Sequence, residues 1–136
     1  MVPPKNRLYD LDKKKLDFLI NASDNLPPSF SFRFIVNHSN FNYNSLDKIH
    51  KIALIDTMFR LSQLNWAALR NSQYHGLGYE IIKRAELKFK LPSDVPIDKN
   101  IIAFRFFGKA PMIGYRDNSG VFYIIAFDSK FLAYNH

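Results

Sequence analysis

The sequence contains no cysteine among its 136 residues. Disulfide bonds, thiolate metal sites and catalysis by a cysteine nucleophile are therefore excluded, and a reducing, cytoplasmic location is expected. Long apolar runs are missing as well, so no segment approaches the roughly 20 residues that a membrane-spanning helix needs. The start of the chain, Met1 to Lys5, lacks the apolar stretch of a secretory signal, so we expect neither a signal nor a membrane partner.

Aromatic and aliphatic residues, by contrast, are plentiful. Hydrophobic residues make up 47% of the chain, with 13 Phe and 7 Tyr, and this composition argues against disorder. A chain of this length predicts one domain with a core of its own. We expect the domain to span residues 1–136, with a helical extension over residues 1–25 and the main body over residues 29–136.

The net charge of the chain is +7, and the positive excess is uneven. Residues 81–136 carry nine Lys or Arg against five Asp or Glu, a net of +4. This distribution is typical of proteins that bind a polyanion, so nucleic acid or an acidic protein is the expected partner. Lysines on strand surfaces also prevent edge-to-edge pairing, and this second interpretation of the charge stays open.

Hydrophobic spacing predicts three helices and one strand in the first half of the chain. Residues 11–22 form a short amphipathic pattern, and residues 46–64 form a longer one that Ser45 is placed to cap. The apolar face of the longer helix is unusually wide, so we expect it to contact two neighbours; the residues that widen it are Ile52, Ile55 and Phe59. A short helix is predicted from Trp66 to Arg70. Residues 29–36 alternate as in a strand with one face in the core, the core-facing residues being Phe30, Phe32, Phe34 and Val36.

The last third of the chain predicts three successive strands. They cover residues 101–107, 111–116 and 121–127, and Asp117 to Gly120 supplies good chemistry for the hairpin loop between the last two. Residues 80–91 fit either a helix or a strand, although the alternation of Leu87, Phe89 and Leu91 favours a strand at the end. The expected fold class is α+β: an antiparallel sheet of about four strands, with helices packed on one face and a C-terminal three-stranded meander.

The element order of residues 29–136, β-α-α-β-β-β in a small basic chain, resembles that of the RelE/ParE superfamily of bacterial toxins. The sequence resemblance lies in residues 101–127, IIAFRFFGKAPMIGYRDNSGVFYIIAF, which look like closing strands in which a basic strand leads into a tyrosine-containing hairpin. The resemblance implies a toxin that an antitoxin protein neutralises. It implies either an mRNA-cleaving ribonuclease that needs no metal or cofactor, or a poison of a topoisomerase such as gyrase.

The resemblance also implies which residues act. Basic side chains would surround the scissile phosphate, and a C-terminal Tyr or His would assist proton transfer; the matching positions are Arg105, Lys109, Arg116, Tyr134 and His136. The sequence departs from the family pattern at Asp128, where a basic residue is often found, with Lys130 two positions later. The predicted N-terminal helix is an addition to the pattern.

The residues themselves leave alternatives open. Cleavage of a phosphodiester without metal needs positive charge at the phosphate together with proton donors and acceptors. Arg105 meets the first need, but it could instead pair with Asp128 or Glu86, and Arg116 could simply pair with Asp117. We expect the catalytic residues to be Arg105, Arg116, Tyr134 and His136, and the RNA-binding residues to be Lys88, Lys90, Lys109 and Lys130.

Histidines and tyrosines complete the candidates. His38 and His50 show no useful pairing, and with few acidic residues nearby we expect no metal site. Three tyrosines could stack on bases or close the outer face of the sheet: Tyr115, Tyr123 and Tyr134.

Two classes of function remain. One is a metal-independent ribonuclease acting on mRNA, and the other is a non-catalytic module that binds nucleic acid or an acidic protein.

Overall fold

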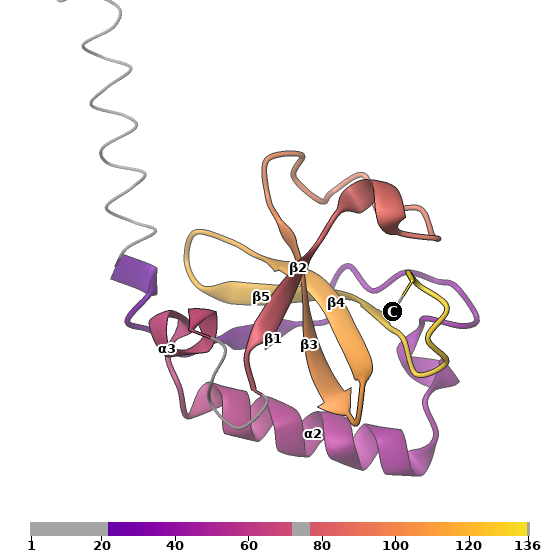
Figure 1. The fold of residues 1–136 in the computed structure, drawn as a ribbon, viewed down its shortest axis with the longest axis horizontal. Coiled ribbons are helices and arrows are strands. Elements are labelled where there is room, and N and C mark those ends of the chain that lie inside the picture. The colour runs from indigo at the N-terminus through magenta and orange to yellow at the C-terminus, as the bar shows by residue number, and fades with distance from the viewer. Residues whose placement is uncertain (1–21, 72–76, 136) are drawn as a thin grey trace, which may run out of the picture.

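The computed structural model describes residues 22–71 and 77–135 (Figure 1). Its elements, in chain order, are β1 (Ser29–Ser31), η1 (Tyr43–Ser45), α2 (Lys48–Ser62), α3 (Trp66–Arg70), β2 (Tyr79–Ile82), η2 (Arg84–Glu86), β3 (Ile101–Phe107), β4 (Ala110–Arg116) and β5 (Val121–Phe127). The predicted helix over residues 11–22 lies outside the described residues, except for its last residue.

The predicted α+β class is confirmed, but the sheet differs in two respects. It has five strands rather than about four, in the order β1-β5-β4-β3-β2. It is mixed rather than antiparallel, because β1 pairs with β5 in parallel. The predicted C-terminal meander is confirmed, since β3 pairs with β4 and β4 with β5 in antiparallel fashion.

The prediction of a strand over residues 29–36 is wrong after Ser31. The Ser31 hydroxyl accepts a hydrogen bond from the Arg33 N–H at 3.2 Å, a local contact that turns the chain out of the sheet. Phe30 therefore packs on the side of the sheet that faces the helices, whereas Phe34 and Val36 pack on the opposite side. Residues 29–36 therefore alternate because Phe30 packs into one core and Phe34 and Val36 pack into the other, and not because these side chains line one face of a single strand.

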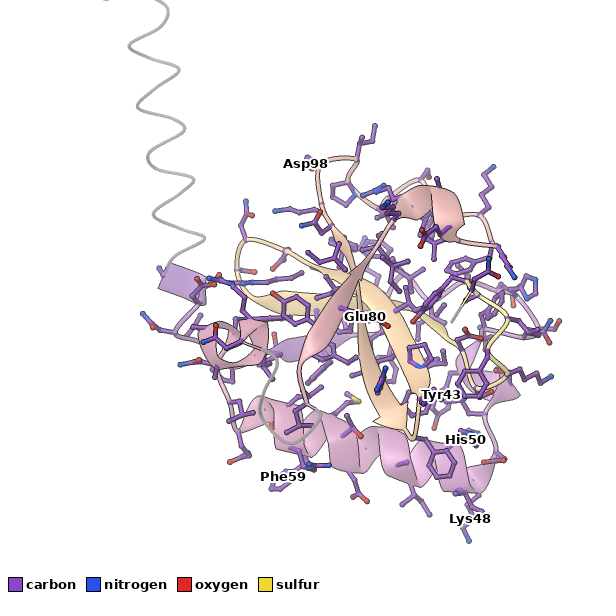
Figure 2. The ribbon with its side chains drawn as sticks, in the orientation of Figure 1. Tyr43, Lys48, His50, Phe59, Glu80 and Asp98 are labelled. Atoms are coloured by element: carbon purple, nitrogen blue, oxygen red, sulfur yellow. The ribbon has the colours of Figure 1, made fainter. Side chains whose placement is uncertain are left out.

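Helix α2 begins two residues later than predicted. Its cap is Asp47, whose Oδ1 accepts the His50 N–H at 2.9 Å, and Ser45 instead closes the short 3₁₀ turn η1. Leu54, Thr57 and Leu61 face the sheet. The opposite side of the helix is exposed by 54 to 66% at four large apolar residues: Ile49, Ile52, Ile55 and Phe59. Within the part of the chain that the structure describes, no second neighbour covers them, and Figure 2 shows Phe59 and Lys48 pointing away from the sheet.

Both faces of the sheet are buried. The helix-side core lies between the sheet and the two α-helices, and its largest residue is Trp66, which packs on Phe104 and Phe122 and donates from Nε1 to the Gly120 carbonyl at 2.9 Å. The tail-side core lies on the other face, where loops and the tail (residues 128–135) cover it; it comprises Phe41, Ile82, Val95, Ile101, Ala103, Ile113, Tyr115, Ile125, Ala126, Ala133 and Tyr134. In Figure 1, α2 runs below the sheet, η2 lies above it and the yellow tail lies at the right of the picture.

The predicted hairpin loop between β4 and β5 is confirmed, whereas the strand predicted at the end of residues 80–91 is not. Asp117 Oδ1 accepts the N–H groups of Ser119 and Val121, and Gly120 takes the left-handed φ of 92° that closes the predicted hairpin. Residues 80–91 contain the end of β2 and the 3₁₀ turn η2, and the strand predicted at Leu87–Leu91 does not form.

None of the helices within residues 22–71 and 77–135 has the length and apolar character needed to cross a bilayer.

Candidate functional site

Two of the predicted catalytic residues meet on the tail-side face of the sheet. Arg105 lies on β3 with its side chain on the same face as Ala103, because side chains alternate along a strand. On the neighbouring strand β2, Glu80 lies opposite Ala103, so its side chain is the diagonal neighbour of Arg105 on that face. The Tyr134 hydroxyl, from the tail, donates to Glu80 Oε1 at 3.0 Å. We refer to these residues as the Glu80–Arg105–Tyr134 cluster.

The electrostatics of the cluster fix the protonation state of the tyrosine. Burial, the hydrogen bond to the Glu80 carboxylate and the negative charge of Asp128 raise the pKa of Tyr134 well above its usual range, while Arg105 opposes them. Tyr134 is therefore a hydrogen-bond donor at every physiological pH and holds one oxygen of Glu80 in place. Glu80 and Arg105 are both exposed, and Figure 2 shows Glu80 over the sheet.

Asp128 determines where Tyr134 lies. This carboxylate is fully buried, and its two oxygens accept the backbone N–H groups of Leu132 at 2.7 Å and Ala133 at 3.0 Å. The Ala133 carbonyl in turn accepts the Lys88 N–H at 2.7 Å, which ties the tail to the segment after η2. A basic side chain at this position could not accept these two hydrogen bonds. None of the ion pairs within the described residues involves Arg105.

Arg116 does not join the cluster. It lies at the far end of β4 from Pro111, the residue opposite Arg105, and it faces the helix-side core. Its guanidinium lies over the Trp66 ring at 4.7 Å and donates to Asp24 Oδ1 at 2.7 Å. The surroundings of Arg116 are those of a structural clamp.

Asp24 connects the beginning of the described chain to both α3 and β4. Its carboxylate lies 2.6 Å from Arg70 Nη2 and 2.7 Å from Arg116 Nη2. Burial by itself raises the pKa of this carboxyl group, but the hydrogen bonds and charges of Arg70 and Arg116 outweigh burial, so the pKa of Asp24 is lowered.

We expect Asp24→Asn to lower the free energy of unfolding at neutral pH by on the order of 1 to 2 kcal/mol. Because the pKa of Asp24 is lower in the folded than in the unfolded chain, this stabilisation is complete above the unfolded pKa, about 4, and is lost as the pH falls through the folded pKa. Urea unfolding of both proteins from neutral pH to about pH 2.5 should show the two stabilities converging in acid. A difference that stays constant over this range would contradict the expectation.

The four predicted RNA-binding lysines are exposed, and they are not all in one place. Lys109 lies in the turn between β3 and β4, and Lys130 lies in the tail with Nζ 3.3 Å from Asn40 Oδ1. Lys88 is joined to the tail through its backbone, and Lys90 follows it on the outside of the tail-side core. His136, the remaining predicted catalytic residue, lies outside the described residues.

Sequence reasoning missed two acidic residues. Glu80 carried no local signal, because only the register of β2 against β3 brings it to Arg105. The conclusion that His50 shows no useful pairing is wrong, since its Nδ1 lies 2.7 Å from Asp47 Oδ1. The backbone N–H of His50, followed by its ring, lowers the pKa of Asp47. The sequence did contain a signal for the pair of Asp47 and His50, because residues three positions apart at the start of a helix lie close together.

The cluster combines a proton acceptor, a cation and a neutral donor, which is the set that phosphodiester cleavage without metal requires. Within residues 22–71 and 77–135, no group of three His, Cys, Asp or Glu side chains is placed to hold a metal ion. Comparisons of the chain with protein-family models, with curated proteins and with solved structures found no match.

Proposed function

We propose that this protein binds RNA and cleaves mRNA without a metal, as a toxin-like ribonuclease that an acidic antitoxin neutralises. The single observation that carries the proposal is the Glu80–Arg105–Tyr134 cluster, in which an exposed carboxylate and an exposed guanidinium are diagonal neighbours on adjacent strands. The net charge of +7 supports a polyanionic substrate and an acidic partner.

The proposed reaction uses each member of the cluster once. Glu80 accepts the proton of a ribose 2′-hydroxyl through the oxygen that Tyr134 does not hold, and the 2′-oxygen attacks the adjacent phosphorus. Arg105 neutralises the negative charge that accumulates on the phosphoryl oxygens. The bond from phosphorus to the 5′-oxygen breaks, and this oxygen takes a proton from water. The hydroxide that remains takes the proton from Glu80, so the products are a 2′,3′-cyclic phosphate and a 5′-hydroxyl.

Tyr134 serves in this scheme as a positioning residue. Its raised pKa makes it unsuitable as a base at neutral pH, whereas its hydrogen bond to Oε1 orients the Glu80 carboxylate and leaves the second oxygen for the substrate. The element order supports the same proposal: a strand, two α-helices and then consecutive strands follow one another, with β2 added before the predicted meander.

The test is induced expression in a bacterial host, with growth and total mRNA integrity followed together, and cleavage of RNA by purified protein in EDTA. We expect Glu80→Gln and Arg105→Ala each to lower the cleavage rate by about 100-fold and to relieve growth arrest. Tyr134→Phe should lower the rate by about tenfold, since the base stays but loses its orientation.

Two substitutions outside the cluster provide matched controls. Glu86→Gln changes an exposed glutamate of η2, and Arg60→Ala changes an exposed arginine of α2; both should leave cleavage and toxicity unchanged. Circular dichroism confirms that each variant is folded. Full cleavage by folded Glu80→Gln protein would remove the proposed mechanism.

A non-catalytic RNA-binding module is the second candidate, favoured by two exposed lysines: Lys130 in the tail and Lys88, which is joined to the tail. Its signature is an RNA affinity that falls steeply with salt, while the RNA stays intact and growth is normal. The same purified protein and RNA distinguish the two functions.

A further inference from the structure

A second feature of the tail-side face is an open groove between residues 33–38 and residues 89–94, with a volume of about 580 Å³. This volume lies within the range of about 300 to 1,000 Å³ that small-molecule sites occupy. Six half-buried apolar residues line the groove: Phe34, Ile35, Val36, Phe89, Leu91 and Pro92. The polar residues of the lining are Asn37, His38, Ser93 and Asp94. Arg33 and Lys90 are exposed at its rim, so we call it the Arg33–Lys90 groove.

A stack of rings leads from the sheet to one wall of this groove. Tyr115 and Tyr123 are stacked with centroids 5.1 Å apart, and the Phe34 ring follows at 5.3 Å from Tyr123. The guanidinium of Arg33 lies over the Phe34 ring at 5.2 Å and ends the series. This series of rings thus positions a planar cation at the surface, where a further planar group can stack on it.

The other wall carries Phe89, whose ring centroid lies 5.0 Å from that of the buried Phe41. This contact holds the ring in place without burying it completely, since Phe89 is half-buried. Neither wall is a strand, so the groove offers no free strand edge with which an extended peptide could pair. Apolar walls with cations at the rim suit a nucleobase inside and phosphates outside.

The groove is connected to the proposed cleavage site by a short stretch of chain. Lys88 donates its backbone N–H to Ala133, the residue before Tyr134, and Lys90 at the rim is two residues further on. An RNA strand with a phosphate at Arg105 can therefore follow the exposed side chains of Lys88 and Lys90 toward the groove. The two cations at the rim, Arg33 and Lys90, outnumber the one carboxylate among the lining residues, which belongs to Asp94.

We propose that the Arg33–Lys90 groove binds an unstacked base of single-stranded RNA, between the guanidinium of Arg33 and the ring of Phe89, with an adjacent phosphate at Lys90. The identity of the ligand rests on the proposed function, and the groove would supply its specificity for single strands. Bases in a duplex are stacked on one another and cannot enter.

Binding is measured with a short fluorescent oligonucleotide whose riboses carry 2′-O-methyl groups, so that the 2′-oxygen cannot attack and cleavage does not interfere. We expect Arg33→Ala to weaken binding about tenfold and Lys90→Ala to weaken it about threefold with a shallower salt dependence. Arg33→Lys retains the positive charge but lacks the planar guanidinium on which a base can stack, so this variant should bind the oligonucleotide nearly as weakly as Arg33→Ala. Arg60→Ala and Lys48→Ala, on α2 across the sheet, are the matched controls and should change affinity by less than about twofold.

The outcomes separate this inference from the proposed function. Groove-dependent binding of the single strand, lost in the duplex and retained in Glu80→Gln, supports the groove even if plain RNA is never cleaved. Full recovery of affinity in Arg33→Lys would show a phosphate contact alone and would overturn base stacking. Unchanged binding in both Arg33→Ala and Lys90→Ala would overturn the site, even if RNA is cleaved.

Discussion

Gly114→Ala is expected to prevent folding. Gly114 lies in the middle of β4, at an irregularity in its pairing with β5, and a Cβ atom there would lie 2.1 Å from the Tyr123 carbonyl oxygen. It would also lie 2.9 Å from Phe122 Cζ, in the helix-side core. Because the closest atom belongs to the backbone of the central strand pair, no side-chain rotation relieves the contact. We expect a loss of about 4 kcal/mol or more, a large part of the stability of an ordinary domain.

The measurement is urea unfolding followed by circular dichroism, with soluble yield as a second readout. Gly108→Ala is the matched control, since Gly108 has a left-handed φ of 56° but no atom within 4 Å of the added methyl group. It should cost about 1 kcal/mol, from backbone strain alone. Equal unfolding midpoints for the two variants would show that β4 and β5 can separate without penalty.

Asp128→Ala should give the second largest effect, about 3 kcal/mol. The substitution leaves the N–H groups of Leu132 and Ala133 without the acceptor that pairs them, and each unpaired group costs about 1 to 3 kcal/mol when buried. The tail that positions Tyr134 then loosens, so RNA cleavage should fall together with stability. Urea unfolding and amide hydrogen exchange at Leu132 and Ala133 measure the two consequences.

Two further substitutions make this result specific. Asp128→Asn retains one acceptor oxygen, so its cost should be about half that of Asp128→Ala. Asp98→Ala removes an exposed aspartate from the loop at the top of Figure 2 and should change stability by less than about 0.5 kcal/mol. Rapid exchange at the Leu132 and Ala133 amides in the wild-type protein would contradict the role of Asp128.

Parts of the fold in which local and tertiary preferences agree were predictable. The strands of the meander, the Asp117–Gly120 turn and the existence of α2 and α3 follow from hydrophobic spacing and turn chemistry. The helix cap was misplaced by two residues, from Asp47 to Ser45, because both side chains can accept the required hydrogen bond. The strand over residues 29–36 was overextended because period-two spacing does not reveal a chain that crosses from one core to the other.

The candidate site was only partly predictable. Arg105 and Tyr134 were named, but Glu80, which accepts the hydrogen bond of Tyr134 and is the diagonal neighbour of Arg105, was not, and Arg116 lies on the opposite face. A strand pattern assigns a residue to one of two faces, whereas the register between strands decides which residues are neighbours across the sheet. Glu80 reaches Arg105 only through that register, and the Arg33–Lys90 groove exists only because two loops distant in sequence lie side by side.

By itself, the sequence determined the composition of the molecule: a basic chain without cysteine, with an α+β element order and a closing meander. Short-range spacing is sufficient for these features, because hydrophobic period and turn residues act within a few positions. The tertiary structure decided the rest: the parallel β1–β5 pair, the fifth strand, the pairing of Asp24 with Arg116 and the grouping of Glu80 with Tyr134. These depend on contacts between residues that are far apart in the chain, whose geometry is set by the packing of both cores against the sheet.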